Sequence, residues 1–202
     1  ISNATTIADA GAFSVSLGSM VHIKTLTASS SGTLSFVHGT DGVVLDSTYP
    51  IYKFEFINIH PATDNAEFTF NMSIDAGSNY NVTKTTTYFN TYHAEDGSGA
   101  GLGYNTNQDL AQSTAFQTLA EDVGADNDQN LGGELTIYNP SSSVFVKHFM
   151  SRTSVTHGGN YMQDVYAAGY GNTTSDVDAI QFKFSSGAIG SGKIKLYGIK
   201  DS

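Results

Sequence analysis

Hydrophobic and polar residues alternate along residues 52–75. Apolar side chains occupy every second position, first at Tyr52, Phe54 and Phe56 and then at Phe68, Phe70, Met72 and Ile74. Because successive side chains of a β-strand point to opposite faces, each run has one apolar and one polar face. The intervening residues 60–66 contain a proline and small polar residues that favour turns. The pattern predicts two strands joined by a loop and paired antiparallel.

Similar alternating runs recur along most of the chain. Turns rich in Gly, Ser and Asn separate them at spacings close to the roughly 8 to 12 residues typical of sandwiches and barrels. The further strands that we predict are residues 12–17, 20–28, 33–38, 82–92, 133–139, 144–152, 161–170, 179–185 and 193–199. Strands do not alternate with helices, which argues against a parallel sheet. We expect an all-β fold, an antiparallel β-sandwich of the jelly-roll type.

Two neighbouring segments depart from the strand pattern. Residues 93–107 are rich in glycine and poor in apolar side chains, which predicts a long surface loop. Residues 107–120 are the one candidate for a short helix, with Asn107 as its cap and an apolar stripe that includes Leu110 and Phe116. Ser113 and Thr114 interrupt this stripe, so we expect only one or two helical turns.

The chain of 202 residues shows no linker and no internal repeat. A chain of this length can bury roughly 70% of its unfolded surface in a single domain. We therefore predict one continuous domain over residues 12–202, with residues 51–202 as the body of the sandwich. Residues 1–50 are expected to supply N-terminal strands and an arm that docks onto another protein.

Composition narrows the function classes. Charged residues make up 14% of the chain, the net charge is −10, and nine basic residues are scattered along it. Nucleic-acid binding needs clustered Lys and Arg, so we expect no nucleic-acid partner. The chain has no cysteine, which excludes disulfides and thiol catalysis. No apolar run approaches the ~20 residues that cross a bilayer, so we expect no membrane partner.

Negative charge gathers between Lys84 and Lys147, where no basic residue occurs. Within this stretch Asp126, Asp128 and Asn130 place oxygen-bearing side chains at alternate positions, as in the first half of a calcium loop. An EF-hand is excluded, because Leu131 and Ile137 stand where it needs a glycine and a carboxylate. Two readings stay open here, a looser calcium site and a solvated acidic loop. No other cofactor is expected.

The sequence carries no catalytic motif. The six histidines lie far apart without zinc-binding spacing, and no serine occurs in a GxSxG elbow. Glu55 and Glu67 are the best carboxylate pair for glycoside hydrolysis, and two charges on a polar sheet face are the simpler reading of them. We therefore expect that the protein is not an enzyme.

Tyrosines near loops and strand ends are the main candidates for a binding surface. The four that we single out are Tyr92, Tyr104, Tyr161 and Tyr166. Exposed tyrosines stack on sugar rings or anchor protein interfaces, because they supply much contact area at small entropic cost. The alternative is ordinary packing on a sheet with the hydroxyl at the rim.

Three segments together resemble a known family. They are residues 52–75, residues 133–149 and the C-terminal AIQFKFSSGAIGSGKIKLYGIK of residues 179–200. They resemble a β-rich domain of predicted virion proteins from tailed bacteriophages, especially marine ones, which commonly closes on a similar SSG, SG and LYG ending. The resemblance covers roughly residues 50–200 and includes no enzymatic motif. It implies a particle component such as a capsid decoration protein, a tail fibre or a tail-associated adhesin.

The expected function is therefore that of a non-enzymatic structural protein of a phage virion, which acts by protein–protein assembly. Its expected partners are other virion proteins and further copies of itself, with a trimer as the favoured symmetry. Its expected location is the extracellular virion particle. The alternative function is that of a carbohydrate-binding module that recognises a glycan on the host surface.

Overall fold

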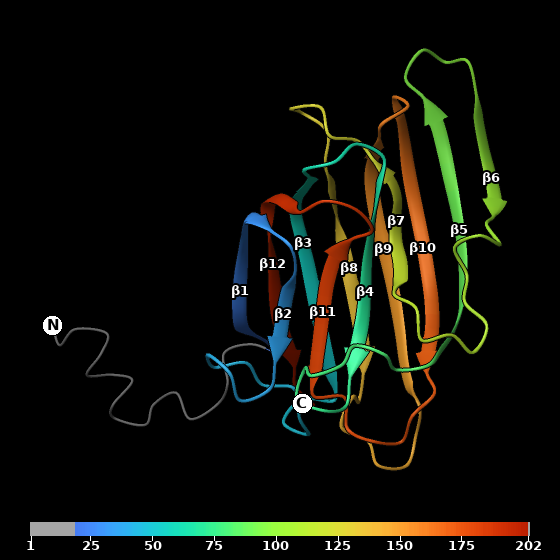
Figure 1. Ribbon diagram of the computed structural model, residues 1–202. Coiled ribbons are helices and arrows are strands. Elements are labelled where there is room, and N and C mark those ends of the chain that lie inside the picture. The colour runs from blue at the N-terminus through green and yellow to red at the C-terminus, as the bar shows by residue number, and fades with distance from the viewer. Residues whose placement is uncertain (1–18, 202) are drawn as a thin grey trace, which may run out of the picture.

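A computed structural model describes residues 19–201, which form twelve strands and no helix (Figure 1). No helix long and apolar enough to cross a membrane occurs in this range. The predicted strand at residues 12–17 lies outside the described residues. The strands are β1 (Met20–Ser31), β2 (Leu34–Val37), β3 (Ile51–Pro61), β4 (Ala66–Ser73), β5 (Lys84–Ala94), β6 (Ala100–Tyr104), β7 (Gln117–Val123), β8 (Leu131–Tyr138), β9 (Lys147–His157), β10 (Tyr161–Gly171), β11 (Ala179–Phe184) and β12 (Ile189–Ile199).

The strands build a long and a short antiparallel sheet that face each other. The long sheet has the order β1-β12-β3-β8-β9-β10-β5-β6, and the short sheet has the order β2-β11-β4-β7. A single residue pair, Val123 with His157, joins β7 to β9. In Figure 1 the strands β1 and β6 lie at the two opposite edges of the long sheet. The predicted antiparallel β-sandwich is therefore confirmed.

The strand order has the jelly-roll connectivity. A jelly roll has eight strands, and here β2 to β8 correspond to strands one to seven and β11 to strand eight. In this numbering the strand order of the short sheet is one-eight-three-six. The strand order of the long sheet is two-seven-four-five, with the hairpin β9–β10 inserted between strands seven and four. This is the double Greek-key order of a jelly roll. The strands β12 and β1 extend the long sheet beyond β3, so the chain from Met20 onward takes part in the sandwich.

The predicted pairing of the two alternating runs of residues 52–75 is wrong. These runs form β3 and β4, which lie in opposite sheets and exchange no strand pairing. The loop between them is a corner that carries the chain from one sheet to the other. Their apolar faces therefore meet across the core, where the rings of Phe56 and Phe68 lie 5.2 Å apart at an angle of 82°. Face-to-face packing buries the apolar side chains of both runs except Ile74, which is 43% exposed beyond the end of β4.

Phenylalanines from both sheets fill the centre of the sandwich. Phe182 of β11 contacts five other rings at centroid distances from 5.3 to 6.4 Å. These rings belong to Phe36, Phe54, Phe56, Phe68 and Phe70, and all six side chains are buried. Edge-to-face contacts dominate this cluster, as expected for aromatic rings that adapt to one another's quadrupoles.

Two predictions for residues 93–120 are wrong. Part of the predicted surface loop forms the edge strand β6, and the end of the predicted helix forms β7. Residues 107–116 do not form a helix, because hydrogen bonds hold them to β5. The N–H of Leu110 donates to Oγ1 of Thr86 at 2.8 Å, and Ser113 and Lys84 each donate a backbone N–H to the other's carbonyl. Gln112 adopts a φ of 47°, which a helix does not tolerate. Tertiary contacts override the local helical pattern here.

Candidate functional site

The four predicted tyrosines divide between the two faces of the long sheet. Tyr92 of β5 lies opposite Gln163 of β10 in the strand register, and its side chain points to the inner face, as does that of Tyr161. Tyr166 lies opposite Phe89, and Phe89 lies opposite Tyr104, all on the outer face. The structure therefore brings Tyr92 and Tyr161 together, with 6.0 Å between their ring centroids. It places the other two tyrosines on a separate surface.

A hollow of about 320 Å³ opens beside Tyr92 and Tyr161. It exists because the short sheet ends at β7, whereas the long sheet continues through β5 and β6 and leaves part of its inner face uncovered. The lining residues, which define the tyrosine groove, are Asn90, Tyr92, Glu121, Tyr161 and Gln163.

Glycines allow both tyrosine rings to lie close to the backbone. A Cβ on Gly101 of β6 would stand 2.8 Å from Cε1 of Tyr92, so only glycine leaves room for this ring. A Cβ on Gly159 would stand 3.0 Å from Cε2 of Tyr161. Tyr92 is nevertheless 41% exposed, which leaves ring surface free for a ligand. Gly101 therefore gives the ring of Tyr92 the space that it occupies beside the groove.

Glu121 forms the polar end of the tyrosine groove. Its carboxylate accepts hydrogen bonds from the side-chain amides of Asn90 at 2.5 Å and Asn105 at 2.7 Å. Burial raises the pKa of Glu121, and the neighbouring carboxylate of Asp122 raises it further. Neither the lining of the groove nor the salt bridges of residues 19–201 supply Glu121 with a cationic partner.

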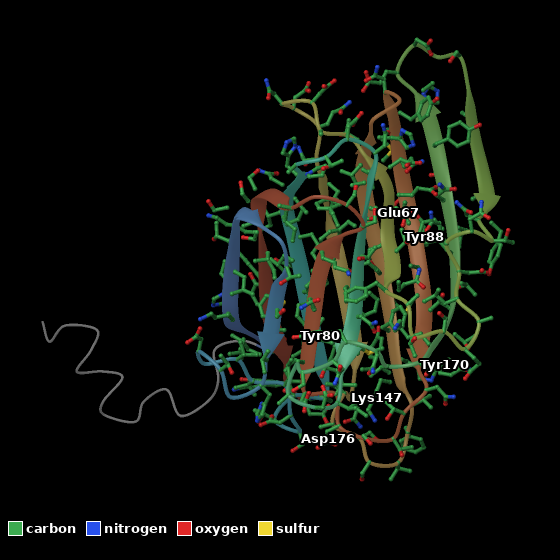
Figure 2. All side chains as sticks on the ribbon, in the orientation of Figure 1. Glu67, Tyr80, Tyr88, Lys147, Tyr170 and Asp176 are labelled. Atoms are coloured by element: carbon green, nitrogen blue, oxygen red, sulfur yellow. The ribbon has the colours of Figure 1, made fainter. Side chains whose placement is uncertain are left out.

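Two buried polar atoms near Glu121 have no hydrogen-bond partner. They are Oε1 of Gln163 and the hydroxyl of Tyr88. Figure 2 labels Tyr88 together with Glu67. Gln163 is only 5% exposed, and Tyr88 is fully buried. Burial raises the pKa of Tyr88, and the negative charge of Glu121 adds to this effect. Buried polar groups are nearly always paired, so unpaired ones mark a region that packing alone does not explain.

A second surface covers the outer side of the long sheet between β8 and β6. We call it the apolar outer face. Its members are exposed or partly exposed apolar and aromatic side chains, namely Phe89, Leu102, Tyr104, Tyr138, Met150, Met162 and Tyr166. Strand register places Tyr166, Phe89 and Tyr104 in one row, in which Tyr166 and Phe89 stack at 4.9 Å with an interplanar angle of 3°. Arg152 continues the row, with its guanidinium 5.0 Å from the ring of Tyr166.

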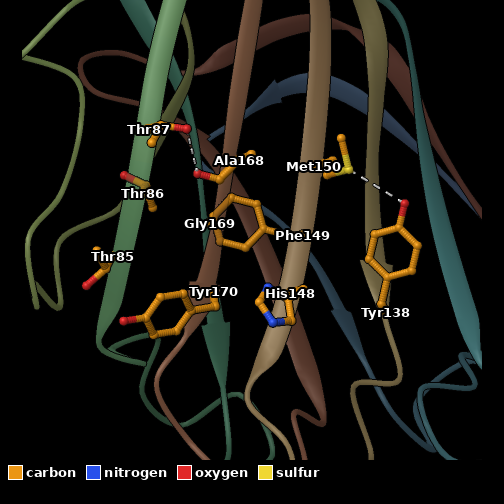
Figure 3. A pocket seen from close by; sticks show the side chains of 10 residues that line it. All are labelled: Thr85, Thr86, Thr87, Tyr138, His148, Phe149, Met150, Ala168, Gly169 and Tyr170. Atoms are coloured by element: carbon orange, nitrogen blue, oxygen red, sulfur yellow. Dashed lines mark hydrogen bonds between the residues drawn. The ribbon is translucent and has the colours of Figure 1, made fainter.

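The apolar outer face contains a shallow hollow of about 500 Å³ (Figure 3). Tyr138 and Met150 lie on one side of it, and Tyr170 and the threonines of β5 lie on the other. Ala168, a small residue between larger neighbours, leaves the space open. The two hydrogen bonds drawn there are long: the hydroxyl of Tyr138 donates to the sulfur of Met150 at 3.8 Å, and the hydroxyl of Thr87 donates to the backbone carbonyl of Ala168 at 3.4 Å.

The remaining part of the same outer side is charged and hydroxylated. β3, β12 and β1 place Lys53, Glu55, Lys193, Lys195 and Thr27 there by register. Lys53 forms an ion pair with Glu134 of β8 at 2.6 Å. The apolar outer face differs from this polar half, although Arg152 and Asp164 form an ion pair at 2.8 Å within it. This contrast marks the apolar outer face as a candidate contact surface.

Two fully buried lysines, Lys84 and Lys147, lie at one end of the sandwich, where both pair in register with Gly171 of β10. The ammonium group of Lys84 donates to Oδ1 of Asn71 at 2.5 Å and to the carbonyl of Val82 at 2.7 Å. Lys147, labelled in Figure 2, donates to the carbonyls of Ser142 and Phe145. Neither side chain has a salt-bridge partner within residues 19–201. Burial lowers the pKa of Lys84 to about 7 and also lowers that of Lys147.

The predicted calcium ligands lie in the loop between β7 and β8. Asp126 and Asp128 are exposed there, and Asn130 donates to the carbonyl of Asp128 at 3.3 Å. Among residues 19–201, no group of three or more His, Asp or Glu side chains is arranged to hold a metal ion. Calcium binding by these residues stays a prediction.

The best carboxylate pair from the sequence does not form a pair. Glu55 lies opposite Glu134 on the long sheet, whereas Glu67 lies on β4 of the short sheet. Glu67 instead accepts a hydrogen bond at 2.9 Å from Gln108, whose amide also reaches Glu121 at 3.5 Å. Sequence reasoning missed Glu121 altogether. The signal that points to it is its place in the run Gln117, Leu119, Glu121, where alternate side chains share one face.

No family model, curated protein or solved structure matches this chain.

Proposed function

We propose that the chain is a non-enzymatic structural protein of a bacteriophage virion, a capsid decoration or tail component, which acts by protein–protein assembly. The observation that carries the proposal is the apolar outer face, on which Leu102 is 72% exposed, Met150 58% and Tyr104 53%. Monomeric proteins rarely expose large apolar patches, and such a patch usually marks a surface that a partner covers. The resemblance of residues 50–200 to virion proteins of tailed phages supports the same function.

The edge of the long sheet adds a second reason to expect a partner at this surface. β6 pairs with β5 on one side only within residues 19–201, and its sequence from Ala100 to Tyr104 contains no charge and no proline. Proteins that must stay monomeric usually protect such an edge with charged residues or prolines. We propose that further copies of this chain and other virion proteins cover the apolar outer face, with a trimer as the favoured self-assembly.

A charge placed on the apolar outer face should disrupt this assembly. We expect the purified chain to sediment as an oligomer in analytical ultracentrifugation and the Met150→Glu variant to shift to monomer. Thr27→Glu is the matched control, because Thr27 is exposed on the polar half of the same sheet side, and it should sediment like the wild type. A wild-type chain that stays monomeric at high concentration, or an equal effect of both variants, would count against assembly through this face.

Recognition of a glycan on the host surface is the second candidate function. The observation that favours it is the pairing of Tyr92 with Tyr161 beside the carboxylate of Glu121. Aromatic rings next to hydrogen-bonding side chains are a common way to bind sugars, because a pyranose ring has both an apolar face and hydroxyl groups. This function would act alongside assembly, since the tyrosine groove and the apolar outer face lie on opposite sides of β5.

A further inference from the structure

The tyrosine groove combines a stacking surface with unsatisfied hydrogen-bond acceptors. Tyr92 and Tyr161 come from neighbouring strands and present tilted rings, with 54° between their planes. Oε1 of Gln163 has no hydrogen-bond partner, although Gln163 is only 5% exposed. Glu121 adds a carboxylate whose two oxygens already accept amide hydrogens and retain further acceptor capacity. A ligand for this groove should therefore supply hydrogen-bond donors and a flat apolar face.

We propose that the tyrosine groove binds an uncharged pyranose residue of a glycan, an inference that rests on the second candidate function. Hydroxyl groups of the sugar donate to Gln163 and Glu121, and one face of the sugar ring packs on Tyr92. The terminal torsion of a glutamine side chain is soft, so the amide of Gln163 can turn its oxygen into the groove when a donor arrives. The hollow of about 320 Å³ lies at the small end of ligand sites, which suits a single ring.

Charge selects against acidic sugars at this site. The lining contains one carboxylate and no Lys, Arg or His. His157 packs against Tyr161 at 4.9 Å, but its Nε2 faces the carboxylate of Asp122 at 3.4 Å. A uronic or sialic acid would bring its carboxylate toward Glu121 with no cation to offset the repulsion, and the chain as a whole carries a net charge of −10. Neutral hexoses and N-acetylhexosamines meet no such penalty.

Titration calorimetry of the full chain tests the inference. The probes are neutral oligosaccharides ending in glucose, galactose, mannose or N-acetylglucosamine, together with their counterparts ending in uronic or sialic acid. We expect binding of at least one neutral probe, and we expect Tyr92→Ala to weaken it about tenfold through loss of stacking. Phe145→Ala is the matched control, because Phe145 is an aromatic residue 70% exposed between β8 and β9, outside both the tyrosine groove and the apolar outer face. It should bind like the wild type.

Gln163→Met separates a role in binding from a role in packing. The substitution keeps the volume of the side chain and removes the buried unpaired oxygen, so the melting temperature should rise. Sugar binding should weaken in the same variant, an effect that a purely structural glutamine would not show. Unchanged affinity in Gln163→Met, or equal losses in Tyr92→Ala and Phe145→Ala, would overturn the assignment of the groove.

The outcomes also separate this inference from the function on which it rests. Binding of acidic probes alone would overturn the preference for uncharged sugars and leave glycan recognition standing. Binding of no probe in either set would overturn both. Assembly through the apolar outer face has its own test in sedimentation and is unaffected by either result.

Discussion

Replacing Phe182 by Ala is expected to lower the free energy of unfolding by about 4 kcal/mol, because Phe→Ala changes in packed cores cost about 3 to 5 kcal/mol. Phe182 is fully buried and contacts rings from β2, β3 and β4, so its loss leaves a cavity lined by both sheets. For a chain of this size, that loss corresponds to a drop in melting temperature of roughly 8 to 16 °C. Urea unfolding followed by circular dichroism measures both the midpoint and the slope.

Phe145→Ala is the matched control for the core variant. Phe145 is 70% exposed between β8 and β9, so its truncation should change the free energy of unfolding by less than about 0.5 kcal/mol. If Phe182→Ala were as mild as Phe145→Ala, the two sheets would not share the phenylalanine core described above, and the facing arrangement of the sandwich would be wrong.

The stability of the wild-type chain is expected to rise with pH between about 7 and 9.5 through Lys84. Burial lowers the pKa of this lysine from 10.5 to about 7 in the folded state. Across this window the unfolded chain therefore binds more protons at this site than the folded chain, and stability increases with pH wherever that holds. The expected gain is about 2 kcal/mol, because the acceptors Asn71 and Val82 favour the charged amine and offset part of the desolvation.

Lys84→Met removes the titrating amine and keeps much of the side-chain volume. The variant should lose the Lys84 share of the pH dependence, so that its free energy of unfolding rises less steeply than that of the wild type. Urea titrations at several pH values up to about 9.5 measure this slope below the range in which tyrosines ionise. Lys193→Met, which changes an exposed lysine of β12, should keep the wild-type slope. Equal slopes in Lys84→Met and the wild type would show that Lys84 does not titrate in this window.

The strands were predictable from the sequence where alternation is strong. The runs that contain Phe54 and Phe56, or Phe68 and Phe70, form β3 and β4, because period two places these aromatic side chains on one buried face of each strand. How strands associate was less predictable. The short loop after Pro61 suits a hairpin equally well, and only the demand to bury both apolar faces against each other sends β4 into the other sheet.

Residues 93–120 show why the remaining errors arose. β6 has glycines on its inner face, at Gly101 and Gly103, so it lacks the side chains by which a strand is recognised. Its pairing depends on β5, and its Gly101 makes room for Tyr92, a contact between residues too far apart in sequence for a local pattern to reveal. Likewise, the bond from Leu110 to Thr86 replaces the helix that local spacing favoured.

The candidate surfaces were predictable only in part. Sequence position singled out Tyr92, Tyr104, Tyr161 and Tyr166 as a group, but strand register separates them into two pairs with different roles. Glu121 and Gln163 belong to the groove because β7 ends the short sheet beside β10 and β5. The buried lysines were missed too, although Lys84 alternates in phase with Thr86 and Tyr88, both of which are buried.

Electron cryomicroscopy of intact particles that contain this chain would show what covers the apolar outer face. We expect density for the jelly-roll sandwich on the capsid or tail, with Met150 and Leu102 covered by a neighbouring copy or by another virion protein. We also expect the tyrosine groove to face outward, open to a host glycan. A map in which the apolar outer face is bare and faces solvent would contradict assembly through this surface.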